Sequence, residues 1–138
     1  MLATGLVAAS ALIALFLGFG HLYLTYFTPS FQPRDPQLGQ KLTEVPLVIT
    51  RDRSFARANV GFHASHGFGL ILLGAVYGYL ALAQSAFFFQ SHYLVAVGAV
   101  AWGCYLVLAL RYWYVVPQLL AGLAFLCYAV GVATAYLG

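Results

Sequence analysis

The chain has 138 residues, of which 63% are apolar and 7% are charged, and its formal net charge is +3. Soluble domains are about 45 to 50% apolar and about 25% charged, so this composition excludes an ordinary soluble domain and indicates a multi-pass membrane protein. We expect no nucleic-acid binding, because the sparse positive charge finds its natural counter-charge in membrane lipids.

Four apolar segments are long enough to cross a bilayer, since a spanning helix needs about 20 residues. These segments are residues 2–28, 58–83, 93–110 and 115–137. The connections after the second and third segments are short, so the last three helices should run antiparallel as neighbours. The sequence therefore predicts an all-α fold, a four-span transmembrane antiparallel helix bundle that forms a single membrane domain over residues 1–138.

The basic residues indicate how such a bundle would be oriented. Every Lys and Arg lies either in the loop at residues 29–57 or at Arg111. With four spans these positions share one side of the membrane, which the positive-inside rule assigns to the cytoplasm. We therefore expect both termini to lie outside the cytoplasm.

The cytoplasmic loop is predicted to carry a short interfacial helix. Asp35 is a suitable N-cap and Pro36 a suitable first residue, so a helix should run to about Thr43. Thr50 is expected to cap a second helical segment that continues through Arg57 into the second span.

Four arginines are expected to lie at the level of the lipid headgroups. They are Arg51, Arg53 and Arg57 in the loop, and Arg111 after the third span. Long basic side chains place their stems in the interface and their charges in the headgroup layer. The alternative for the loop arginines is a site for an anionic substrate.

Three histidines lie inside the predicted spans. His21 precedes Pro29 by eight residues and His66 follows Ala58 by eight, so both should lie about 12 Å inside the same boundary at about 1.5 Å per residue. His63 lies one turn before His66. Ionisable groups at this depth usually face the bundle interior or a cavity, so His21 and His66 are expected to meet across a helix interface.

Two interpretations of these histidines remain open. Neutral imidazoles can hydrogen-bond across a helix pair and act as ordinary polar contacts between membrane helices. Alternatively His21 and His66 could ligate haem b, one histidine could hold the magnesium of a chlorin, or His63 could join them in a metal site. Separately, Gly74 and Gly78 form a GxxxG pair that favours close helix packing.

Several stretches of the chain carry a family resemblance. They are Arg34–Pro36, Ile49–Arg51, Arg57–His66, Tyr77–Tyr79, and Arg111–Trp113 with Pro117. With these stretches the chain resembles a family of small uncharacterised bacterial four-helix integral membrane proteins. The resemblance implies the same topology, in a bacterial plasma (inner) membrane, and no known reaction. That family commonly has Asn at the position of His63, so the resemblance implies roles for His21 and His66 only.

Three functional hypotheses follow. The first is a non-catalytic accessory subunit of a larger membrane complex, with membrane-protein partners or as a homo-oligomer, because the small-residue faces exceed what four short helices need. The second is a haem-b or chlorin-binding electron-transfer element. The third is a small transporter or lipid-modifying enzyme. The third rests on the arginine cluster of the loop alone. Separately, Arg57, Ala58 and Asn59 resemble the start of a helix in membrane-associated glutathione and eicosanoid enzymes, but the acidic residue expected on that helix is absent.

Overall fold

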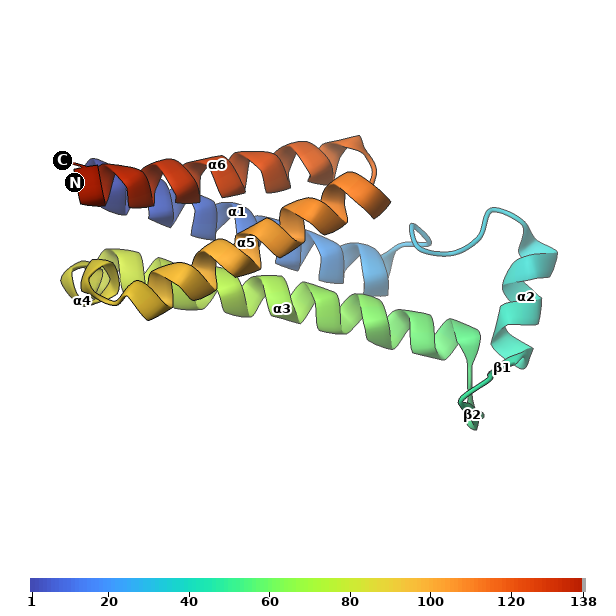
Figure 1. The fold of residues 1–138 in the computed structure, drawn as a ribbon. Helices are drawn as coiled ribbons and strands as arrows, with labels where there is room; N and C mark the ends of the chain where they lie inside the picture. The colour runs from blue at the N-terminus through green and yellow to red at the C-terminus, as the bar shows by residue number, and fades with distance from the viewer. Residues whose placement is uncertain (138) are drawn as a thin grey trace. The chain divides into compact units, whose positions relative to one another are not determined.

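The computed structural model describes residues 1–137 of the chain, which form six helices and one short hairpin (Figure 1). In chain order the elements are α1 (Leu2–Phe27), α2 (Pro36–Glu44), β1 (Pro46–Leu47), β2 (Thr50–Ser54), α3 (Phe55–Ala83), α4 (Ser85–Gln90), α5 (His92–Tyr112) and α6 (Val115–Leu137). Within this described part, α1, α3, α5 and α6 are long and apolar enough to cross a membrane. The predicted all-α class and the four candidate spans are therefore confirmed.

The chain divides into two compact units. Unit 1 comprises Met1–Leu17 and Leu70–Gly138, and unit 2 comprises Gly18–Gly69. Helices α1 and α3 each contribute one part to either unit, whereas α4, α5 and α6 belong to unit 1 alone.

Unit 1 contains the apolar core. Its largest fully buried side chains are Trp102 of α5, Tyr128 of α6 and Phe88 of α4. Tyr128 donates a hydrogen bond to the Val95 carbonyl oxygen at 2.8 Å, and Tyr77 donates to the Leu94 carbonyl oxygen at 2.8 Å. Phe88 lies in the short connection between the second and third predicted spans, where the short helix α4 places its ring edge-on to Tyr77.

Close backbone approach in unit 1 depends on glycine. A Cβ at Gly74 would lie 2.6 Å from the Ala11 carbonyl oxygen of α1. A Cβ at Gly78 would meet only the Ala11 side chain, at an ordinary 3.6 Å. A Cβ at Gly131 of α6 would lie 3.0 Å from the Ala3 carbonyl oxygen, which places the end of α6 beside the start of α1 (Figure 1).

Unit 2 contains the loop with its short helix. The Asp35 side chain accepts a hydrogen bond from the Gln37 backbone N–H and caps α2, as the sequence predicts. The predicted helical segment from Thr50 is wrong, because Thr50 begins strand β2, which pairs antiparallel with β1. Val48 and Ile49 form the turn of this hairpin, and the β-branched Thr50 that follows favours extended backbone. The Phe55 N–H then bonds to the Val45 carbonyl oxygen at 2.9 Å, so α3 begins only after the hairpin closes.

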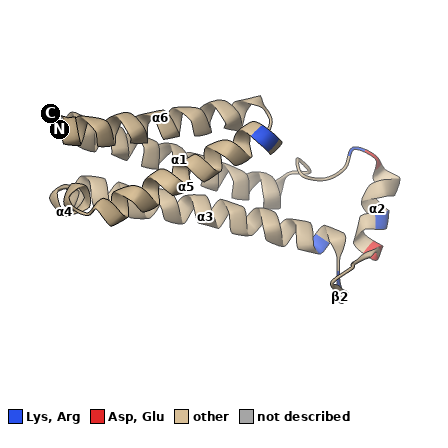
Figure 2. Ribbon diagram, viewed as in Figure 1, with Lys and Arg blue, Asp and Glu red and all other residues tan. Residues whose placement is uncertain are grey.

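The surface of the long helices is apolar. Large exposed apolar side chains occur on each, including Phe16 on α1, Leu72 on α3, Val100 on α5 and Leu119 on α6. Monomeric soluble proteins rarely expose extensive apolar patches, whereas membrane spans present such surfaces to lipid. In unit 2, Figure 2 shows the charged residues on the loop just before α2, on α2, on the hairpin and in the first turns of α3. The charged side chain of unit 1 in the described chain is that of Arg111, near the end of α5.

Candidate functional site

Unit 2 brings the three predicted histidines into one cluster. His21 lies on α1, and His63 and His66 lie one turn apart on α3. The Nε2 atom of His21 is 3.1 Å from the Nδ1 atom of His63, a hydrogen-bonding distance. The His21 and His66 rings meet edge to face, with centroids 4.8 Å apart. All three side chains are half-buried.

Phe31 of the loop completes this cluster. Its ring stacks on His63 with centroids 4.1 Å apart and planes inclined by 12°, and its centroid is 4.7 Å from that of His21. The Asn59 side-chain amide donates to the Phe31 carbonyl oxygen at 3.4 Å. The loop is therefore fastened to α1 and α3 through both the ring and the backbone of Phe31.

Phe31 was not predicted from the sequence as a site residue. Phe31 is the single aromatic residue between Thr28 and Ser54, in a stretch that is otherwise mostly polar. Because aromatic rings bury a large area, an isolated one in a polar loop is a usable signal for a docked segment.

A cavity of about 570 Å³ lies beside the cluster, within unit 2. Its lining includes hydrogen-bonding side chains from α1, α2 and α3, namely Thr25, Gln40, Thr43, Asn59 and His63. Phe31 and the adjacent loop residues Gln32 and Pro33 also line it. None of the described residues that line the cavity is charged. Such a lining suits a ligand whose part inside the cavity is polar but uncharged.

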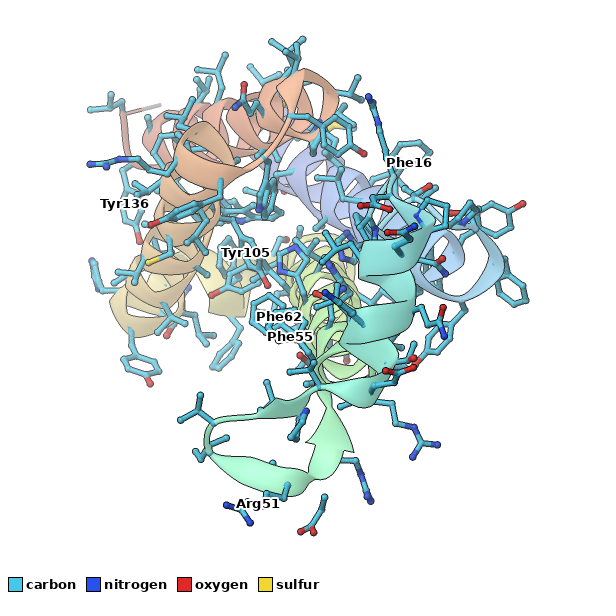
Figure 3. The ribbon with its side chains drawn as sticks, turned by 90° about the vertical axis from the view of Figure 1, so that its right-hand side faces the viewer. Phe16, Arg51, Phe55, Phe62, Tyr105 and Tyr136 are labelled. Carbon is cyan, nitrogen blue, oxygen red and sulfur yellow. The ribbon has the colours of Figure 1, made fainter. Side chains whose placement is uncertain are left out.

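A second, more open hollow of about 1130 Å³ lies along the hairpin and the first turns of α3, and we call it the arginine groove. Arg51, Arg53 and Arg57 line it together with Glu44 and Asp52, so three basic and two acidic side chains leave one net positive charge. Arg53 Nη1 donates to the Asp52 carbonyl oxygen at 2.8 Å. Figure 3 shows Arg51 on the hairpin. Arg111 is exposed near the end of α5, in unit 1, and does not belong to this group.

The histidine geometry does not fit the proposed haem. An iron between two axial imidazoles lies about 2 Å from each nitrogen, so the rings stand on opposite faces of the macrocycle and cannot touch. His21 and His66 instead meet edge to face, and a flat macrocycle has no room between them. Within residues 1–137, no group of three His, Cys, Asp or Glu side chains is arranged to hold a metal ion.

Comparison of the chain with protein-family models, with curated proteins and with solved structures finds no match. The family resemblance of the sequence motifs therefore stays an expectation.

Proposed function

We propose that this chain is a multi-pass membrane protein that binds the polar head of a membrane-soluble molecule in the cavity of unit 2. The observation that carries the proposal is the cavity beside the histidine cluster, lined by uncharged hydrogen-bonding groups from three helices. Buried or half-buried polar side chains in a membrane protein usually face a functional cavity.

The cluster supports a fixed orientation for the ligand. A neutral imidazole has one donor and one acceptor nitrogen, so a hydrogen bond between His21 and His63 couples the tautomers of the two rings. Nδ1 of His63 is engaged with His21, which makes Nε2 the ring nitrogen that can meet a ligand. Stacking against Phe31 restricts the plane of the same ring. Preorganised polar groups of this kind give a binding site its specificity.

We also propose in which membrane the protein lies and which of its loops and termini face the cytoplasm. The family resemblance supports a bacterial plasma membrane, and the positive-inside rule supports a cytoplasmic loop at residues 29–57, with both termini outside. In this arrangement the cavity would lie near the cytoplasmic interface, where the polar head of an amphiphile resides.

The accessory-subunit hypothesis has less support from the geometry. That hypothesis rests on more small-residue helix faces than four short helices need for their own packing. Four of the glycines, however, have close neighbours within the chain: Gly67, Gly74, Gly98 and Gly131. These glycines serve the packing of the units themselves. Membrane-protein partners and a homo-oligomer stay predictions, and we propose no catalytic role, since the described lining of the cavity holds no carboxylate.

The test is mass spectrometry of the organic extract from the purified full-length protein. We expect a bound molecule whose amount falls about two- to tenfold in His63→Ala and in Asn59→Ala, because a lost hydrogen bond is worth about 0.5 to 1.5 kcal/mol. His92→Ala is the matched control, since His92 lies in unit 1. A protein with no bound molecule, or equal loss in the control, would contradict the proposal.

A further inference from the structure

The cavity and the arginine groove adjoin one another. Thr43, Ala56 and Val60 line both, so the two hollows meet at the same residues of α2 and α3. Both lie wholly within unit 2. One ligand of sufficient length can therefore occupy both, and its parts must match two different chemical environments.

The two environments differ in charge. The groove has three arginines and one net positive charge, whereas the described lining of the cavity is uncharged. Guanidinium groups bind phosphate oxygens through paired, charge-assisted hydrogen bonds. The cavity offers hydroxyl, amide and imidazole groups, which suit hydroxyls of a ligand. The fitting ligand has a phosphate joined directly to an uncharged, hydroxylated group.

The hairpin supports a lipid as the source of that phosphate. Val48 and Ile49 form its turn, and both side chains are exposed although they are apolar. Arg51 and Arg53 follow immediately on β2. Apolar side chains beside basic ones are the pattern of a segment that inserts into the headgroup region of an anionic membrane.

We propose that the cavity and the arginine groove together hold one anionic glycerophospholipid, with its phosphate at Arg51, Arg53 and Arg57 and its uncharged hydroxylated headgroup in the cavity. This inference rests on the proposed function of the cavity. A zwitterionic headgroup fits less well, because its ammonium would enter a cavity whose described lining provides no carboxylate.

The test uses the full chain in phosphatidylcholine nanodiscs doped with phosphatidylglycerol or with phosphatidic acid, and native mass spectrometry counts the bound lipid. Phosphatidylglycerol carries both the phosphate and the hydroxylated headgroup, whereas phosphatidic acid carries the phosphate alone. We expect binding in the order phosphatidylglycerol, phosphatidic acid, phosphatidylcholine. Replacing Arg51, Arg53 and Arg57 by Gln should lower binding of both anionic lipids by about tenfold or more.

Two further variants separate charge from headgroup recognition. His63→Ala should lower phosphatidylglycerol binding to the level of phosphatidic acid and leave phosphatidic acid unchanged. Arg34→Gln is the matched control, because Arg34 is in the same loop but lines neither hollow, and should change nothing. Replacing the three arginines by Lys keeps the charge and should restore part of the binding, which guards against a folding defect in the Gln variant.

The outcomes distinguish this inference from the proposed function. If the arginine variants bind both anionic lipids normally, while His63→Ala still loses its co-purified molecule, the lipid inference is wrong and the cavity function stands. If soluble glycerol 3-phosphate displaces phosphatidylglycerol completely, the ligand is a free phosphate ester and the lipid inference is again wrong. If His63→Ala changes neither the amount of the co-purified molecule nor the binding of phosphatidylglycerol, the proposed function of the cavity is wrong.

Discussion

Units 1 and 2 divide α1 and α3 between them but hold different kinds of residue. Of the buried apolar side chains in the described chain, Ala64 alone belongs to unit 2, and the rest belong to unit 1. Unit 2 instead contains the histidine cluster, the cavity and the arginine groove. The buried apolar contacts and the polar sites therefore lie on different parts of the same two helices. Substitutions in unit 1 should lower the stability of the fold, whereas substitutions in unit 2 should affect the loop and ligand binding.

The largest expected effect is on the packing of unit 1. In Gly74→Ala the new methyl group would meet the Ala11 backbone, which cannot move without shifting α1. We expect a loss of about 1 to 3 kcal/mol in the free energy of unfolding, measured by dodecyl sulfate titration in mixed micelles.

Gly78→Ala is the control for that substitution. Its methyl group would make an ordinary contact with the Ala11 side chain, and alanine has the higher helix propensity by up to about 1 kcal/mol. The stability of this variant should be unchanged or slightly raised. Equal losses of stability at both positions would show that the GxxxG pair acts as a unit and that the predicted difference between the two substitutions is wrong.

A smaller effect is expected from a buried hydrogen bond of unit 1. Tyr128→Phe keeps the ring but removes the hydroxyl that donates to the Val95 carbonyl oxygen. Hydrogen bonds between membrane helices contribute about 0.6 kcal/mol on average and about 1.7 at most, so the same titration should show a loss in that range. Tyr93→Phe, at an exposed position on α5, should leave stability unchanged. A comparable loss in Tyr93→Phe would argue against a specific role for the Tyr128 hydroxyl.

Regular helix geometry explains what could be predicted from the sequence. Because each residue advances a helix by a fixed rise, counting from Pro29 and Ala58 was enough to bring His21 level with His66. The same counting could not show that His63 lies within hydrogen-bonding distance of His21, since that depends on side-chain rotamers. Nor could the GxxxG pattern show that Gly74 meets backbone while Gly78 does not.

The loop was harder to predict because its structure depends on contacts between distant residues. Thr50 fits an N-cap pattern, yet the pairing of β1 with β2 outweighs it, and strand preferences depend strongly on such context. Phe31 docks only because His21 and His63 lie 10 and 32 residues away on two helices. The isolated aromatic ring in a polar loop can indicate that the segment docks, but the local sequence does not show which residues Phe31 contacts.

The smallest effect on global stability is expected from Phe31→Ala in unit 2. The substitution removes the stacking on His63, and aromatic pairs contribute about 0.5 to 1.5 kcal/mol beyond area burial. Because Phe31 lies outside the apolar core, the titration midpoint should not change. Amide hydrogen exchange over residues 28–45 should become about two- to tenfold faster, since local opening is a separate equilibrium from global unfolding.

Phe19→Ala is the control for this last variant, because Phe19 is exposed on the part of α1 that belongs to unit 2. It should leave exchange in the loop unchanged. If Phe31→Ala instead lowered global stability as much as Gly74→Ala, the loop would be part of the folding core and the separation of the two units would be wrong. If only hydrogen exchange in the loop becomes faster, Phe31 holds the loop that forms part of the cavity wall. The same variant should then release the bound molecule without unfolding the helices.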